Sequence, residues 1–129
     1  MSDRVVDASV FAAAFFAEAR AAEAHDLLKG FELHGPELLP YEMAGAAAAK
    51  TRSDPALSGT IAIALETALA ARVNLVSVPG RQLLTLALAT GLSVYDVSYL
   101  WVARELGCEL ATFDRQLARA AERESLLAR

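Results

Sequence analysis

The sequence is poor in the residues that build disulfide frameworks and soft-metal sites. It has one cysteine, Cys108, and two histidines among 129 residues. A single thiol cannot form an intrachain disulfide, and the chain has no paired Cys or His ligands for zinc or iron–sulfur centres. We therefore expect a protein of a reducing compartment, the cytoplasm, whose stability comes from packing rather than from cross-links.

Long apolar runs are also absent, although 55% of the residues are hydrophobic. A membrane-spanning helix needs about 20 consecutive apolar residues, and no such stretch occurs, so we expect no membrane contact. Asp7 interrupts the apolar stretch near the N-terminus, which argues against a signal peptide. Much of the hydrophobicity comes from 28 alanines, which favour closely packed helices. The length predicts a single domain over residues 1–129.

A surplus of positive charge is the third absence. The chain has 12 Lys and Arg against 16 Asp and Glu, which gives a net charge of −4. This balance argues against binding nucleic acid through broad neutralisation of its phosphates. Any contact with nucleic acid therefore needs a local positive source.

Strand-like and helical segments alternate along the chain. Short apolar or β-branched runs occur around residues 5–6, 38–40, 73–78 and 108–113. Helical patterns cover residues 11–29 (one bent helix or two short ones), 41–50, 57–72, 81–89, 97–106 and the segment after 114. This order predicts a three-layer α/β/α sandwich with a mainly parallel sheet of four to five strands. Ligands of such sheets bind beyond the carboxyl ends of the strands.

Four acidic residues stand out because they lie in apolar surroundings at expected strand ends or helix starts. They are Asp7, Glu42, Asp96 and Asp114. Taken singly, each has a structural explanation, since acids cap helices and complement the helix dipole, and Ser93-x-x-Asp96 matches a capping box. Asp7 is harder to explain in this way because Ser9 could cap the same helix. We expect all four to point to one edge of the sheet.

Four carboxylates that converge on one crevice repel each other unless a cation binds between them. Carboxylate oxygens match Mg²⁺ or Mn²⁺, and the lack of paired His or Cys argues against zinc. Such an ion would also supply the missing positive charge at a phosphate and could activate a water molecule. Without these four residues, the acids and bases would be equal in number, 12 each.

The four acids lie in short motifs, which are Val5-Val6-Asp7-Ala8-Ser9, Pro40-Tyr41-Glu42, Tyr95-Asp96 followed by Tyr99-Leu100 and Ala103, and Thr112-Phe113-Asp114-x-x-Leu117. These motifs resemble those of PIN-domain proteins, and in particular the VapC-type toxins of bacterial toxin–antitoxin pairs. The likeness spans nearly the whole chain, in the right order and spacing, and many relatives continue into a further strand after the last helix.

The resemblance implies a metal-dependent endoribonuclease that uses Mg²⁺ or Mn²⁺, is held inactive by a cognate antitoxin and forms a homodimer. Asp7, Asp96 and Asp114 would organise the metal, and Glu42 would orient the metal or its water. Ser9 and Thr112 match small hydroxyl positions that could support a carboxylate. Independently of the resemblance, Arg115 and Arg119 follow Asp114 closely enough to reach an RNA phosphate, although solvated helix faces are the favoured explanation of both residues.

Two other functional interpretations compete with the nuclease. A phosphotransfer protein would use Asp7 as an acceptor, but a receiver domain needs adjacent acids and a late lysine, and a dehalogenase-like phosphatase needs an Asp where Ser9 stands. A catalytically silent PIN-like binding module would keep the acids only as helix caps.

Overall fold

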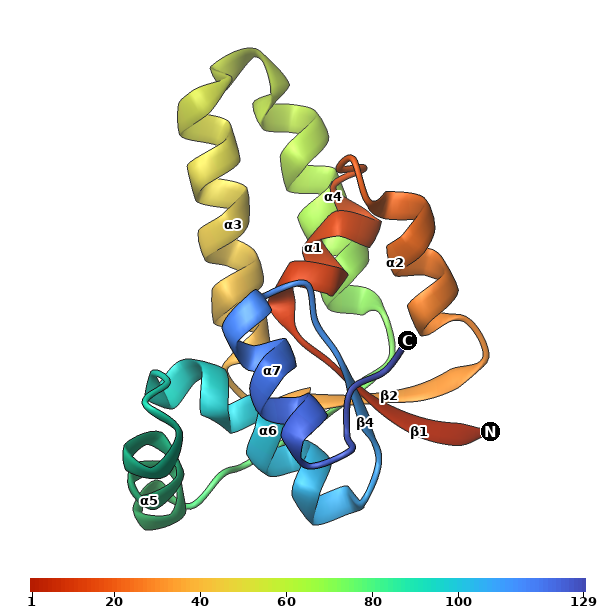
Figure 1. Cartoon of the computed structure of the whole chain (residues 1–129). Helices are drawn as coiled ribbons and strands as arrows, with labels where there is room; N and C mark the ends of the chain where they lie inside the picture. The colour runs from red at the N-terminus through yellow and green to blue at the C-terminus, as the bar shows by residue number, and fades with distance from the viewer.

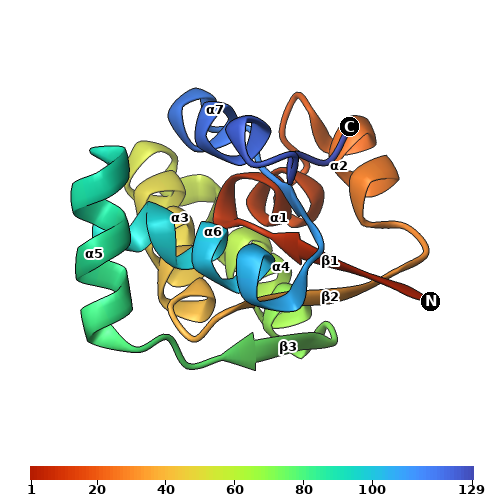
Figure 2. The ribbon, with the colours of Figure 1, turned by 60° about the horizontal axis from the view of Figure 1, so that its bottom comes forward.

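The sheet is fully parallel and has four strands in the order β3-β2-β1-β4. The computed structural model describes all 129 residues. The strands are β1 (Ser2–Val6), β2 (Phe31–Pro36), β3 (Val73–Val76) and β4 (Glu109–Ala111). Figure 2 shows β1, β2 and β3 side by side, and α6 packs against β1, β2 and β4. The prediction of a parallel four- to five-stranded sheet is confirmed.

Helices cover both faces of the sheet, so the three-layer prediction is also confirmed. In Figure 1, α1 to α4 lie above the sheet, α5 and α6 lie below it, and α3 and α4 form a hairpin that extends well beyond the sheet. The helices are α1 (Ala8–Phe15), α2 (Ala21–Leu28), α3 (Leu39–Ser53), α4 (Ser58–Ala70), α5 (Gly80–Thr90), α6 (Val94–Leu106) and α7 (Arg115–Arg123), with a short 3₁₀ turn, η1 (Pro55–Leu57).

One expected strand is wrong. Residues 38–40 do not form a strand; Leu39 and Pro40 open α3, and the strand lies earlier, at Phe31–Pro36. Proline suits the first turn of a helix because no N–H partner is needed there. Of the two alternatives for residues 11–29, the structure has two short helices, α1 and α2.

The ends of two other helices follow the sequence closely. Gly91 and Gly107 terminate α5 and α6 in the left-handed conformation, with φ of 74° and 63°. This conformation is strained for residues with a Cβ atom, which explains glycine at both positions. Ser93 caps α6 by accepting a hydrogen bond from the Asp96 backbone N–H (3.1 Å), as the capping box predicts.

The core lies between the sheet and the two helical layers. Val5, Val6 and Leu110 are fully buried in the sheet, and Leu100 of α6 and Leu117 of α7 pack into the same cluster. No single helix is long and apolar enough to cross a membrane, and α5 and α6 reach that length only together, across a bend of 105°.

The C-terminal segment adds a fragment of a fifth strand. Leu110 donates its N–H to the carbonyl of Leu126 (2.6 Å) and accepts from Ala128 N–H (2.9 Å). Leu110 and Leu127 form a single parallel bridge beside β4. This bridge covers the outer edge of β4, which would otherwise expose unpaired backbone groups.

The strand order places a crevice between β1 and β4. The chain moves from β1 outward to β2 and β3 and then returns to pair β4 with the other side of β1. The segments that follow two neighbouring strands run away from the sheet in opposite directions. A gap therefore opens at the carboxyl ends of these strands, and ligands of such sheets bind there. Asp7 follows β1 directly, and Thr112 follows β4.

Candidate functional site

Asp7 is the buried centre of the crevice. Its side chain caps α1, with Oδ1 accepting hydrogen bonds from Val10 N–H (3.1 Å) and Ser9 Oγ (2.6 Å). Its other oxygen, Oδ2, accepts from Thr112 Oγ1 (2.5 Å). Only 5% of the residue is exposed. Both oxygens are therefore held in place by donors from α1 and from the segment after β4.

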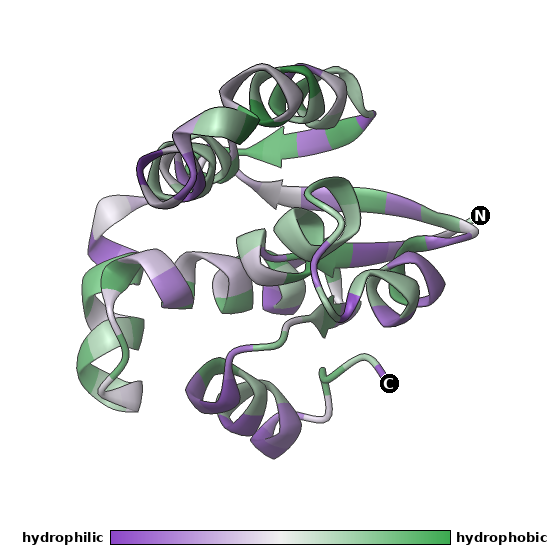
Figure 3. Cartoon of the chain, turned by 90° about the horizontal axis from the view of Figure 1, so that it is seen from above, coloured by the Kyte–Doolittle hydropathy of each residue, from purple (hydrophilic) through white to green (hydrophobic).

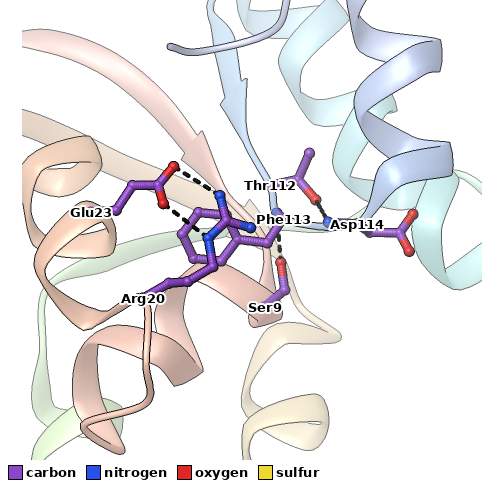
Figure 4. A network of polar contacts seen from close by, with 6 residues as sticks. All are labelled: Ser9, Arg20, Glu23, Thr112, Phe113 and Asp114. Atoms are coloured by element: carbon purple, nitrogen blue, oxygen red, sulfur yellow. Dashed lines mark hydrogen bonds and ion pairs between the residues drawn. The ribbon is translucent and has the colours of Figure 1, made fainter.

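The two hydroxyl groups that bind Asp7 also fix the loop between β4 and α7. Ser9 Oγ accepts from Phe113 N–H (2.9 Å), and Thr112 Oγ1 accepts from Asp114 N–H (3.0 Å). Figure 4 shows these two contacts side by side. Each hydroxyl thus accepts from the loop and donates to Asp7. The supporting role expected for Ser9 and Thr112 has a geometric basis in these contacts.

Burial raises the pKa of Asp7 to about 6. Desolvation is the largest cause, and the nearby charge of Glu42 adds to it; hydrogen bonds from Ser9, Thr112 and Val10 oppose both. Asp7 is therefore ionised at neutral pH at a cost to the folded state. A cation beside it would remove that cost.

Glu42 lies in the first turn of α3 and is held from the opposite face of the sheet. Its Oε1 accepts a hydrogen bond from the hydroxyl of Tyr99 (2.5 Å), a buried residue of α6. Burial is the main reason that the Tyr99 pKa is raised above its ordinary value, and the hydrogen bond to Glu42 is the second. Tyr99 therefore stays neutral and donates permanently to Glu42.

We expect Tyr99→Phe to weaken Mn²⁺ binding about tenfold, because it removes the donor that orients Glu42 while keeping the ring. The measurement is a calorimetric Mn²⁺ titration. Tyr95→Phe is the matched control, since Tyr95 is exposed on the same helix. Mn²⁺ affinity of Tyr99→Phe equal to that of the parent would show that Tyr99 only fills the core.

Asp96 and Asp114 form a second pair of acids. Asp96 lies in the first turn of α6, and Asp114 caps α7 by accepting from Leu117 N–H (2.8 Å). Partial burial raises the pKa of Asp96, and the charge of Asp114 raises it further. The two carboxylates are therefore close enough to repel each other.

The donor set fits a hard divalent cation, although the side chains are not gathered tightly. No group of three Asp, Glu, His or Cys side chains is arranged to hold a metal ion. The acids form two pairs instead. The charge of Glu42 raises the pKa of Asp7, and the charge of Asp114 raises the pKa of Asp96. Mg²⁺ usually binds one or two carboxylates and keeps several waters, so two such pairs suit it.

The six ion pairs of the structure leave all four acids without a basic partner. They join Arg4 to Glu109, Arg20 to Glu23, His34 to Asp3, Lys50 to Glu18, Arg104 to Glu124 and Arg129 to Glu122. The negative charge of the crevice is thus uncompensated by the chain itself.

Arg115 and Arg119 lie on exposed positions of α7, one turn apart, and neither takes part in an ion pair. Figure 3 shows α7 as one of the most hydrophilic helices. Both guanidinium groups are free to meet an anion, and Arg115 directly follows Asp114.

Two features of the site have only weak signals in the sequence. Tyr99 belongs to a motif, but its partner Glu42 is 57 residues away, and nothing local indicates the contact. Arg20 lies over the ring of Phe113, 3.6 Å from the ring centre, although 93 positions separate the two. Only the folded chain brings these pairs together.

Comparisons with known proteins match nearly the whole chain. The PIN domain matches residues 4–123. Ribonuclease VapC3 of Pyrobaculum aerophilum is 35% identical over 120 residues, covering 88% of this chain and 91% of that protein. The crystal structure of PAE2754 from the same organism is similar in fold, with a TM-score of 0.72 at 24% identity, covering 92% of this chain and 78% of that one.

Proposed function

Because this chain belongs to the PIN-domain family, we propose that it is a metal-dependent endoribonuclease and the toxin of a toxin–antitoxin pair. The observation that supports the proposal is two pairs of acids, Asp7 with Glu42 and Asp96 with Asp114, none of which has a basic partner. The ribonuclease relative supports the choice of RNA as substrate. That relative is archaeal, so the proposal is not restricted to bacteria.

Asp7, Asp96 and Asp114 would hold Mg²⁺ or Mn²⁺, with Glu42 oriented toward it. The ion would neutralise the phosphate and favour ionisation of a water molecule. Ser9 and Thr112 keep Asp7 fixed, and Tyr99 keeps Glu42 fixed. Water would add to the phosphorus, the bond to one ribose oxygen would break, and the water's proton would pass to that oxygen.

The positive charge that RNA binding needs would come from α7 as well as from the ion. Arg115 and Arg119 are unpaired and would contact phosphates near Asp114. These contacts position the RNA backbone and carry no sequence information.

Two apolar surfaces would serve the protein partners. Leu84 and Leu88 on α5 and Tyr95 at the start of the neighbouring α6 are exposed, and these residues would form the homodimer surface. Phe15 and Phe16 line a separate groove of about 540 Å³ between the end of α1 and the α3–α4 hairpin, and this groove would receive an antitoxin segment.

The test is digestion of RNA by the chain purified free of partners. We expect cleavage with Mn²⁺, none with EDTA, and recovery when Mn²⁺ is returned. A second candidate is a silent binding module, and the actual capping contacts of Asp7 and Asp114 favour it. Intact RNA under all three conditions would support the module and contradict the enzyme.

A further inference from the structure

A groove of about 550 Å³ opens beside the acids, and the mechanism above gives no role to its side farther from them. Its volume lies within the range of small-molecule sites, about 300–1,000 Å³. Small side chains form much of its lining, including Ala8, Ala12, Ala13 and Ala46. Ser9 and Glu42 belong to the groove as well, so it is continuous with the acidic crevice.

Arg20 and Phe113 form a flat wall of this groove. The guanidinium carbon of Arg20 lies 3.6 Å from the centre of the Phe113 ring, which is a close cation–π contact. Figure 4 shows the guanidinium lying over the ring, with Glu23 at its Nε–Nη2 edge. About half of the Arg20 side chain is exposed, so the guanidinium is accessible from the side away from the ring.

Glu23 makes this guanidinium poorly suited to a phosphate. It accepts hydrogen bonds from Arg20 Nε (2.9 Å) and Nη2 (2.8 Å). This fork occupies one of the two edges through which a guanidinium binds a phosphate in a bidentate manner, and it compensates the charge. It also holds the planar face of Arg20 in one orientation. Nucleobases stack on such guanidinium planes in single-stranded RNA complexes.

The platform is also tied to the reaction centre. Phe113 N–H donates to Ser9 Oγ, and Ser9 donates to Asp7. A base stacked on Arg20 would therefore be held at a fixed offset from a phosphate at the acids. A base inside a duplex is already stacked and could not occupy this position.

From this geometry we propose that the alanine-lined groove is a nucleobase subsite, in which one unpaired base next to the scissile phosphate stacks on Arg20 over Phe113. The inference rests on the proposed function and specifies its substrate as RNA with an unstacked base. Any of the four bases could stack, because each has a π face.

The test is fluorescence anisotropy of a labelled single-stranded 12-mer RNA of mixed sequence, in EDTA so that no cleavage occurs. We expect Arg20→Ala and Arg20→Lys each to bind about tenfold more weakly than the parent, as for the loss of one stacked base. The slope of affinity against salt should not change, whereas Arg119→Ala should lower it. Arg72→Ala, an exposed arginine before β3, is the matched control.

A second variant, Phe113→Leu, removes the ring under Arg20 while keeping an apolar side chain, and we expect a similar loss. Parent-like binding by Arg20→Lys, or a reduced salt slope for Arg20→Ala, would overturn the inference, because charge alone would then explain the contact. The inference is also overturned if the Arg20 variants bind RNA like the parent but no longer bind a protein that copurifies with the parent chain.

These outcomes separate the subsite from the enzyme. Cleavage by the parent with full RNA binding by the Arg20 variants contradicts only the subsite. Arg20-dependent binding without any cleavage in Mn²⁺ contradicts only the nuclease.

Discussion

Asp7→Asn is expected to lower metal-dependent RNA cleavage about 10³-fold or more and yet to stabilise the metal-free protein at pH 7. The loss of activity follows because the metal supplies several kcal/mol of stabilisation to the reacting phosphate, and Asp7 is its buried ligand. An amide oxygen keeps the cap on Val10 N–H, and the amide N–H₂ can donate to Thr112 Oγ1 in place of the present contact.

The gain in stability follows from the raised pKa. Burial lifts the pKa of Asp7 from 3.8 to about 6, so the folded state favours the protonated form. The stabilisation of the folded state by the protonated carboxyl is fully present below about pH 4 and is lost as the pH rises through about 6. At pH 7 the ionised carboxylate costs about 3 kcal/mol, which the asparagine avoids.

Urea unfolding in EDTA at pH 4, 5, 6 and 7 measures the effect. The advantage of Asp7→Asn over the parent should appear between pH 4 and 6 and then level off. Asp26→Asn, an exposed change on α2, is the control and should follow the parent. Parent-like cleavage by Asp7→Asn would remove Asp7 from the catalytic site.

The second large effect concerns Asp96 and Asp114 together. We expect Asp96→Asn and Asp114→Asn each to reduce Mn²⁺-dependent cleavage about 10²-fold or more. The double variant should cleave RNA less than about threefold more slowly than the less active of the two single variants. Residues that act as a unit give such non-additive losses, because the first change already disables the shared ion.

Asparagine is chosen because it is as good a helix cap as aspartate. It can accept from Leu117 N–H as Asp114 does, and the hydrogen bond from the Asp96 backbone N–H to Ser93 Oγ does not depend on the side chain. If the acids serve only as caps, all three variants should behave like the parent. Kinetics of a fluorogenic RNA at fixed Mn²⁺ distinguishes the two cases, and multiplicative losses would contradict a shared ion.

The layers of the fold could be predicted from the sequence because β1, β3 and β4 lie in apolar runs and α5 and α6 end at glycines. The position of the second strand, β2, could not be predicted in this way. It reads Phe-Glu-Leu-His-Gly-Pro, with alternating polar residues typical of an exposed edge, whereas the apolar Leu38–Pro40 that follows belongs to α3. The contact between His34 Nε2 and Asp3 Oδ1 (2.8 Å) that ties this strand to β1 joins residues 31 positions apart, so it has no local signal.

The acids of the site could be predicted because each stands in apolar sequence at the end of an element. Their supports were predictable only in part. Ser9 and Thr112 flank two of the acids in the chain, but the Tyr99–Glu42 and Arg20–Phe113 contacts join separate layers. Such contacts depend on how helices pack across the sheet, which local sequence does not encode.

The central claim is that the four acids form one binding site for a divalent cation. Calorimetric titration of Mn²⁺ into the metal-free, partner-free protein tests it most directly. Our account predicts specific heat of binding for the parent and its loss in Asp7→Asn, Asp96→Asn and Asp114→Asn, with Asp26→Asn unchanged. No specific heat in the parent, or equal binding by the parent and all three site variants, would contradict it.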